Sequence, residues 1–216
     1  KIYDQNDHRI DNGKIDGDAV KVASRLKKYN YQAFLVGGAV RDLVLDKVPK
    51  DFDLVTDATP QQIKSIFRNA RIIGKRFRLV HVYFPGKIIE LSTFRANTTG
   101  KDDQNIYGAI DEDVHRRDFS INALFYDPLE KTLVDFVDGL EDIRAGRMRS
   151  LIPLNVTFKE DPVRIIRAIK YSEIHGFHMG WKLKRSLRKY APELERIPPS
   201  RMTEEVFKIL QSGYAA

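Results

Sequence analysis

Apolar residues in the first 150 positions occur in short runs that are typical of strands, with amphipathic stretches between them. The runs predict strands at residues 32–36, 52–55, 71–73, 78–84, 87–93 and 132–137. Helical spacing predicts helices at 18–29 with Asp18 as N-cap, at 38–45, 60–68 and 116–125, and from Gly139. This part of the chain is therefore expected to be an α+β domain, a mixed sheet with helices.

Beyond about residue 150 the pattern becomes helical throughout. Asp161 is expected to cap a helix with Pro162 at its first position, and further helices fit 181–190 and 200–210. Residues 1–17 are polar and turn-rich, and 96–113 form a polar, Gly-containing loop. We therefore expect an N-terminal arm at 1–17, a head domain at 18–150 and an all-helical segment at 151–216, with the chain truncated after it.

The composition, with 42% hydrophobic and 31% charged residues, indicates a globular protein. No apolar run approaches the ~20 residues that span a bilayer, so no integral membrane segment is expected. The absence of cysteine excludes disulfide partners and thiolate zinc sites, and it fits a reducing cytoplasm.

The net charge of +7 is unevenly distributed along the chain. Residues 141–216 carry 15 Lys and Arg against 9 Asp and Glu, whereas the first 140 carry 22 against 21. A basic segment beside a nearly neutral one suits a polyanionic substrate such as nucleic acid. The alternative is a helical segment with a solvated basic face.

Two acidic residues and a glycine pair carry the most informative spacing. Gly37 and Gly38 follow an apolar strand, where a sharp turn lets the backbone approach a phosphate. Asp51 and Asp53 lie two residues apart on a strand, so both carboxylates point to one face and suit Mg²⁺. Each half alone is commonly a plain turn or a solvated strand end, but together they indicate metal-assisted phosphoryl or nucleotidyl transfer.

Glu90 is a third acidic candidate, because a carboxylate in an apolar strand costs free energy unless it is paired or binds a cation. If its strand neighbours the Asp51–Asp53 strand, the three acids form one cluster that suits a two-metal site. The alternative is a surface ion pair of Glu90 with Arg95 or Lys87.

Two further motifs combine acids with arginines. On the predicted 116–125 helix, Asp118 and Asn122 share a face that suits a ribose, and Arg117 faces a phosphate. The alternative there is a capped helix with an apolar core face. Asp161 and Arg164, one turn apart, could read the edge of a base, or they could form an N-cap and its ion pair.

The segment Lys75-Arg76-Phe77-Arg78 places cations around an aromatic ring, which suits phosphates and a stacked base, or else an amphipathic edge strand. The five histidines have no carboxylate partner at ligand spacing and are interpreted as incidental. The chain lacks the Gly-x-x-x-x-Gly-Lys-[Ser/Thr] sequence of P-loop proteins.

Taken in order, these motifs resemble those of the class II nucleotidyltransferases, the tRNA CCA-adding enzymes and bacterial poly(A) polymerases. The resemblance runs from about Tyr31 to Gln211. Its blocks are Gly37-Gly38-x-x-Arg41-Asp42 with Asp51-x-Asp53, Arg116-Arg117-Asp118-Phe119-x-x-Asn122-Ala123, Asp135-x-x-Asp138-Gly139 with Asp142, Glu160-Asp161-Pro162-x-Arg164-x-x-Arg167-Ala168, and Pro198-Pro199-Ser200-Arg201 continuing to Glu205.

The resemblance implies a polymerase-β-like nucleotidyltransferase head followed by a helical neck. It implies that Asp51 and Asp53 bind two Mg²⁺ ions, with Glu90 as a further catalytic acid. The residues implied to bind the nucleotide are Gly37, Gly38 and Arg41 at the triphosphate, Arg117, Asp118 and Asn122 around phosphate and ribose, and Asp161, Arg164 and Arg167 in the neck. Those implied to bind RNA are Lys75, Arg76, Phe77, Arg78 and Arg201.

Among these enzymes, the basic and aromatic segment 74–82, with 71–74 before it and Ile197-Pro198-Pro199 near the end, resembles bacterial poly(A) polymerases. We therefore predict template-independent transfer of AMP from ATP to RNA 3′ ends, an RNA-processing activity. CCA addition to tRNA and a catalytically silent RNA-binding module are the alternatives. The chain departs from the family in a short 96–113 loop and in lacking the helices that follow the neck.

Overall fold

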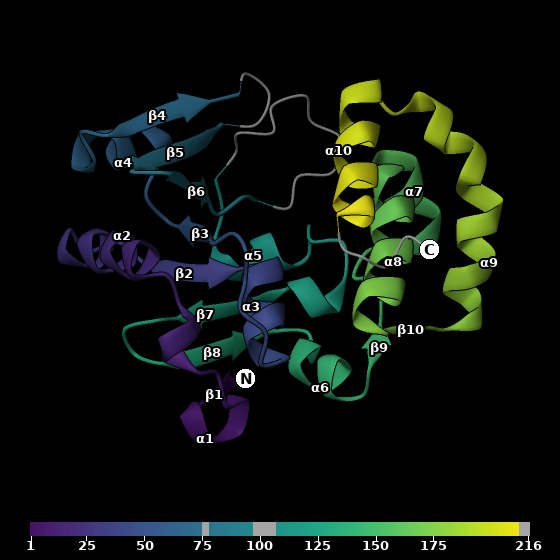
Figure 1. Cartoon of the computed structure of the whole chain (residues 1–216), viewed down its shortest axis with the longest axis horizontal. Coiled ribbons are helices and arrows are strands. Elements are labelled where there is room, and N and C mark those ends of the chain that lie inside the picture. Colours follow the sequence, from purple (N-terminus) through teal and green to yellow (C-terminus); the bar gives the residue numbers. More distant parts are fainter. Residues whose placement is uncertain (75–77, 97–106, 212–216) are drawn as a thin grey trace. The chain divides into compact units, whose positions relative to one another are not determined.

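The computed structural model describes residues 1–74, 78–96 and 107–211 (Figure 1). The chain divides into two compact units. The first comprises 1–116 and 122–140, and the second comprises 117–121 and 141–216. The division falls between Leu140 and Glu141, earlier than the change of sequence pattern near residue 150. The separate roles of head and neck stay predictions.

The first unit is built on a mixed sheet, which has eight strands in the described residues (Figure 1). The strand order is β1-β8-β7-β2-β3-β6-β5-β4, and β3 and β6 are its parallel pair. The strands are β1 (Ile2–Tyr3), β2 (Ala33–Val36), β3 (Asp53–Thr56), β4 (Ala70–Ile73), β5 (Leu79–Phe84), β6 (Lys87–Thr93), β7 (Leu124–Asp127) and β8 (Thr132–Asp135). The predicted mixed sheet with helices is confirmed.

Helices cover one face of this sheet. The helix α2 packs on β2 and β3, and α4 packs on β4 and β5. The buried residues Val80, Val82, Ile89 and Leu91 therefore face these helices, and the residues that alternate with them face the other way. The helices are α1 (Gln5–His8), α2 (Gly17–Lys28), α3 (Gly38–Val44), α4 (Pro60–Ile66) and α5 (Ile110–Val114), with the 3₁₀ turn η1 (Asn12–Lys14).

Four local predictions for this unit are wrong. Residues 1–17 are not a loose arm, because β1 pairs with β8 and adds a strand to the sheet. Asp16, not Asp18, caps α2, since its carboxylate accepts from the N–H groups of the first turn. The predicted 116–125 helix is replaced by the 3₁₀ turn η2 (Ser120–Asn122) and by β7, and α5 lies at the end of the expected 96–113 loop.

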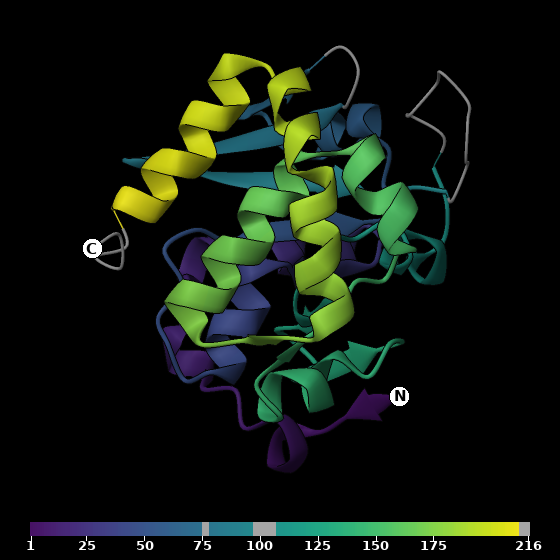
Figure 2. The same cartoon turned by 90° about the vertical axis from the view of Figure 1, so that its right-hand side faces the viewer.

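The second unit is helical apart from a small parallel pair of strands (Figure 2). The helix α8 packs against both α7 and α10, and α7 packs against α9. Val163, Ile166 and Ile197 form a buried apolar cluster between α8 and the chain before α10. The elements are α6 (Gly139–Arg144), which begins in the first unit, β9 (Arg147–Met148), α7 (Leu154–Glu160), α8 (Val163–His175), β10 (His178–Met179), α9 (Trp181–Tyr190), η3 (Ala191–Arg196) and α10 (Pro199–Leu210).

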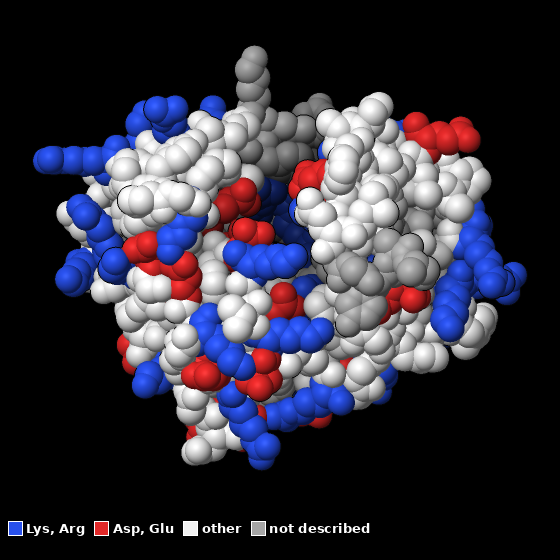
Figure 3. Space-filling view, viewed as in Figure 1, with Lys and Arg blue, Asp and Glu red and all other residues white. Residues whose placement is uncertain are grey.

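The helix α9 carries the densest positive charge of the second unit. Its buried side chains are Leu183, Leu187 and Tyr190, and its exposed face holds five cations and no acid. Lys and Arg side chains gather over this helix in the space-filling view (Figure 3). Within the described part of the chain, no helix is both long and apolar enough to cross a membrane.

Candidate active site

Two acidic residues meet on the sheet face opposite α2 and α4. Asp53 begins β3 and Glu90 lies on β6, and the parallel register pairs these two residues directly. Their neighbours Leu54 and Leu91 are paired and buried on the helix side, so both carboxylates lie on the other face. The condition for an acidic cluster, that the strand of Glu90 neighbours the strand of Asp53, is therefore met. Asp51 is exposed and lies two residues before Asp53, outside the strand.

A histidine completes this row of polar residues. His81 on β5 pairs in register with Glu90, and its Nε2 lies 3.3 Å from Glu90 Oε2. An ionised carboxylate can only accept, so Nε2 donates the hydrogen bond. The interpretation of His81 as incidental is therefore wrong. The alternative pair of Glu90 with Lys87 is also wrong, because Lys87 binds Asp16 and Asp18 instead.

The residue types of this face suit a divalent cation. Carboxylate oxygens are the donors that Mg²⁺ prefers, and neighbouring strands hold Asp53 and Glu90 about 5 Å apart. Asp51 lies close enough in sequence to add a third oxygen ligand. In the described ranges, no group of three or more His, Asp or Glu side chains is arranged to hold a metal ion. The acids thus fit the cation chemically without forming a closed ligand set.

The Gly37–Gly38 turn positions a buried arginine. Gly37 has φ +69° and ψ −135°, a conformation that side chains rarely adopt, and α3 begins directly after it. Arg41 on that helix is 5% exposed. Its Nη1 donates to Asn122 Oδ1 at 2.8 Å, and its Nε and Nη2 donate to Asp42 Oδ1. The structure therefore brings together Arg41 and Asn122, and the role of both toward a nucleotide stays a prediction.

In the second unit, Asp118 belongs to a buried network of charges. Arg167 Nη1 lies 3.6 Å from Asp118 Oδ2, and Arg167 Nε donates to Glu205 Oε1 at 2.8 Å. Lys170 Nζ donates to the other oxygen of Glu205 at 2.5 Å. Since Asp118 does not share a helix face with Asn122, the predicted spacing argument for this pair is wrong.

Burial and charge act against one another in this network. Burial raises the pKa of Glu205, but the hydrogen bond from Lys170 and the charge of Arg167 outweigh burial and lower that pKa overall. For Arg167, burial would lower the pKa, and Tyr171, Asp118 and Glu205 together raise it. Burial lowers the pKa of Lys170 despite Glu205. Glu205 is therefore the ionised centre that holds two cations.

The predicted base-reading pair has other partners within the second unit. Asp161 ends α7 and does not cap α8, whose N-cap is Pro162 without a side-chain hydrogen bond. Arg201 lies 3.2 Å from Asp161, and Arg164 Nη1 donates to Thr157 Oγ1 at 3.0 Å. The predicted N-cap is wrong because α7 runs up to the residue before Asp161.

The remaining predicted residues are placed as follows. Lys75, Arg76 and Phe77 lie outside the described residues, and Arg78 is exposed at the start of β5. Arg117 is half-buried in the second unit. Sequence reasoning missed Glu205. It found the positive charge of residues 141–216 but did not place it on α9, where five of the ten residues are Lys or Arg.

The sequence profile described as "Poly A polymerase head domain" matches residues 33–149. A second profile, "Probable RNA and SrmB-binding site of polymerase A", matches residues 176–216. Poly(A) polymerase I of Escherichia coli O6:H1 is 41% identical over 228 residues, which cover 99% of this chain and 49% of that protein. A CCA-adding enzyme of Bacillus licheniformis is 34% identical over 203 residues, which cover 92% of this chain and 51% of that enzyme.

Among solved structures, the Bacillus stearothermophilus CCA-adding enzyme in complex with CTP is similar, with a TM-score of 0.80 and 32% identity. The similarity covers 89% of this chain and 47% of that one. The chain therefore belongs to the class II nucleotidyltransferase family, which contains poly(A) polymerases and CCA-adding enzymes. It spans about half the length of the curated relatives it matches.

Proposed function

We propose that the protein transfers AMP from ATP to the 3′-hydroxyl of RNA without a template. The observation that carries the proposal is the Asp53–Glu90 pair on the open face of a nucleotidyltransferase head, with Asp51 two residues away. Nucleotidyl transfer depends mainly on positioning and on charges beside the reacting phosphate. The paired carboxylates supply charge for a metal ion beside the phosphate, and the glycine turn lets the backbone approach that phosphate.

In the proposed reaction, the RNA hydroxyl attacks the α-phosphate of ATP in line and pyrophosphate leaves. Asp51 and Asp53 would hold Mg²⁺, and Glu90, hydrogen-bonded to His81, would add a third negative charge. Bound Mg²⁺ would lower the pKa of the attacking hydroxyl and neutralise the leaving oxygens. The Gly37–Gly38 turn lets the backbone approach the triphosphate.

Contacts to the rest of the nucleotide are also part of the proposal. Asn122, held by Arg41, and Asp118, held by Arg167, face the ribose. Asp161 and Arg164 read the base. A cytoplasmic location and a role in RNA processing follow from the same proposal.

Substituting the acids tests the catalytic assignment. Asp51→Asn or Asp53→Asn is expected to abolish AMP incorporation while ATP binding largely survives, because an amide is a poorer ligand for Mg²⁺ than a carboxylate. Incorporation into an RNA primer and equilibrium ATP binding are measured side by side. Asp111→Asn, at an exposed position of α5, is the matched control. Near-normal turnover of either active-site variant would contradict the assignment.

Poly(A) addition is favoured over CCA addition because the poly(A) polymerase I relatives are the more similar in sequence, at 41% against 34% identity. CCA addition remains the second candidate, because the similar solved structures include CCA-adding enzymes with CTP and with ATP. The two are separated by offering CTP alone and ATP alone with a tRNA that lacks its last three nucleotides. Incorporation of CTP first would establish CCA addition instead.

A silent RNA-binding module is a third possibility of a different class. It predicts RNA binding with no incorporation of any nucleotide. The same nucleotide panel distinguishes it from both enzymes, provided that RNA binding is measured on the same preparation.

A further inference from the structure

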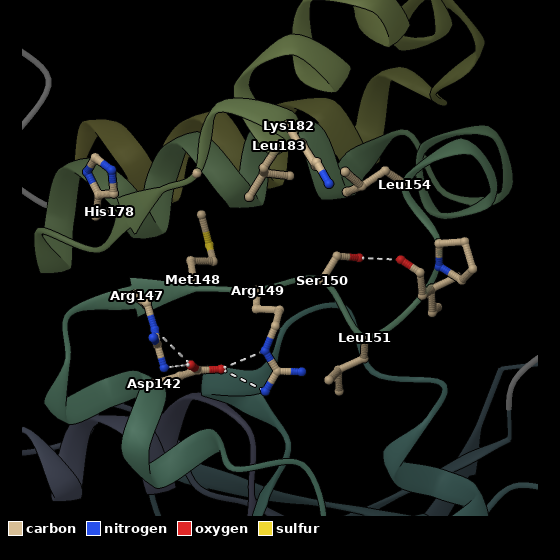
Figure 4. A pocket seen from close by; sticks show the side chains of 13 residues that line it. Asp142, Arg147, Met148, Arg149, Ser150, Leu151, Leu154, His178, Lys182 and Leu183 are labelled. Carbon is tan, nitrogen blue, oxygen red and sulfur yellow. Dashed lines mark hydrogen bonds and ion pairs between the residues drawn. The ribbon is translucent and has the colours of Figure 1, made fainter.

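A cavity of about 660 Å³ lies in the second unit, lined by residues of α6, β9, the chain leading into α7, and the start of α9 (Figure 4). This volume is within the range of pockets that bind small molecules, about 300–1,000 Å³. The residues proposed to read the base, Asp161 and Arg164, do not line it. We propose that this cavity binds a nucleoside phosphate, separately from the ATP site.

The charge of the lining calls for an anion. Asp142 is 2% exposed, and Arg147 and Arg149 bind its two oxygens from opposite sides, each at 2.9 Å (Figure 4). Asp142 is the one acid among the described residues that line the cavity, whereas Arg147, Arg149 and Lys182 are cations. The two arginines keep 62% and 50% of their side chains exposed. The arginine pair therefore carries more positive charge than Asp142 neutralises.

The lining beside Lys182 is apolar, whereas Arg147 and Arg149 point toward Asp142 on the other side of β9 (Figure 4). Met148, Leu154 and Leu183 contribute most directly, and Leu151 to Pro153 extend the apolar surface. A ligand with a flat apolar body and one phosphate satisfies both parts, because its base can lie between the aliphatic side chains while Lys182, whose ammonium lies between Leu183 and Leu154 (Figure 4), binds the phosphate. The choice of nucleoside phosphate over other amphipathic anions rests on the proposed function, which supplies both free nucleotides and RNA.

A single introduced thiol can report on the cavity, because the chain contains no cysteine. Ser150→Cys places the thiol in the lining, and Ser65→Cys, exposed on α4, is the control. AMP at ten times its dissociation constant is expected to slow alkylation of Ser150→Cys roughly tenfold and to leave Ser65→Cys unchanged. If Ser150→Cys does not fold, Leu154→Cys in the same lining replaces it.

A charge reversal on α9 tests the proposed phosphate contact. In the Ser150→Cys background, Lys182→Glu is expected to raise the AMP concentration for half-protection at least roughly tenfold, the cost of losing a charged hydrogen bond. Lys184→Glu makes the same charge change on the same helix outside the cavity. It is expected to change the AMP concentration for half-protection less than about twofold. Equal effects of the two variants would overturn the proposal.

Two further probes identify the ligand. Protection by inorganic phosphate at the same concentration as AMP would leave only an anion site and overturn the nucleoside part. A 5′-phosphorylated oligo(A) that protects at lower concentration than AMP supports a nucleotide of the RNA strand as occupant, and weaker protection supports the free nucleotide. If neither AMP nor the oligo(A) protects Ser150→Cys, the proposal is overturned. Alkylation measures binding without turnover. A failure of the cavity proposal is therefore distinguishable from a failure of the proposed AMP incorporation.

Discussion

In the first unit, pairing between neighbouring strands places the polar side chains of Asp53, Glu90 and His81 in one row. Asp53, Glu90 and His81 are register partners on three adjacent strands, so each side chain has a fixed neighbour on the same face. The hydrogen bond from His81 holds one oxygen of Glu90, Oε2. Groups that orient a catalytic carboxylate commonly matter nearly as much as the carboxylate itself.

Removing the His81 side chain is therefore expected to slow turnover. His81→Ala should lower kcat for AMP incorporation about tenfold and change the KM for ATP less than about twofold, because the residues that bind the nucleotide remain in place. His81→Gln, whose amide can still donate to Glu90, should restore most of the rate. His115→Ala, at an exposed position, is the control. A fall in stability with no separation of kcat from KM would point to a purely structural role.

The proposed base-reading pair makes a second prediction. Asp161→Ala combined with Arg164→Ala is expected to reduce the preference for ATP over CTP at least about fivefold, since a paired donor and acceptor discriminate bases by about 1–3 kcal/mol. The ratio of kcat/KM for the two nucleotides measures the preference.

Arg201→Ala is the control for this pair, because it removes the ion pair to Asp161 and leaves both base-reading side chains in place. An equal loss of preference in Arg201→Ala would mean that Asp161 acts by holding α10. An unchanged preference in the double variant would leave Asp161 and Arg164 as structural residues.

The site was partly predictable from local pattern. Asp51, Asp53 and Glu90 stand out because they interrupt apolar strands, but the parallel pairing of β3 with β6 is set by distant residues and has no local signal. His81 could have been found. Only Pro85 and Gly86 separate the predicted strands 78–84 and 87–93, so a tight turn there pairs Phe84 with Lys87, and counting back along both strands pairs His81 with Glu90.

At the scale of elements, long apolar runs were predicted well and short or competing segments were not. The segment 116–125 has helical spacing, yet its last two residues, Leu124 and Phe125, begin β7, because pairing of Val36 with Phe125 joins β7 to β2 in the sheet. A two-residue strand such as β1 carries no periodicity at all. The sequence Asp161-Pro162 is typical of a helix start, but Asp161 is the C-cap of the preceding helix α7.

One buried carboxylate of α10, Glu205, binds Arg167 and Lys170 of α8 and adds ion pairs to the apolar packing of the two helices. Glu205→Gln is expected to lower the free energy of unfolding by about 3–5 kcal/mol, because two cations lose a buried partner. Glu204→Gln, next to it and exposed in a pair with Lys208, should cost less than about 1 kcal/mol. Chemical denaturation followed by circular dichroism at neutral pH measures both.

The pH dependence of this contribution follows from the lowered pKa of Glu205. Because the folded-state pKa lies below the usual 4.5, the stabilisation is complete above that value and is lost as pH falls through the folded-state value. The difference in unfolding free energy between the native chain and Glu205→Gln is therefore expected to shrink in acid. A difference that stays constant down to pH 2 would contradict the ionised role of Glu205.

Over the whole molecule, positive charge is concentrated in one part of the chain. Residues 141–216 hold 15 Lys and Arg against 9 Asp and Glu, and α9 alone presents Lys182, Lys184, Arg185, Arg188 and Lys189 at its surface. A solvated helix needs no such excess, whereas a polyanion binds it with release of counterions. The proposed RNA substrate gives this distribution a function.

Reversing charges on α9 is expected to weaken RNA binding and its dependence on salt. Lys184→Glu with Arg188→Glu should reduce the slope of log affinity against log salt by about 0.7 for each RNA phosphate that the helix no longer neutralises. Fluorescence anisotropy of a labelled single-stranded RNA at several salt concentrations measures the slope. Lys28→Glu with Lys64→Glu, exposed on the first unit, makes the same change in net charge. If both pairs lower the slope equally, net charge alone attracts RNA; a larger change for the α9 pair identifies direct binding of phosphates there.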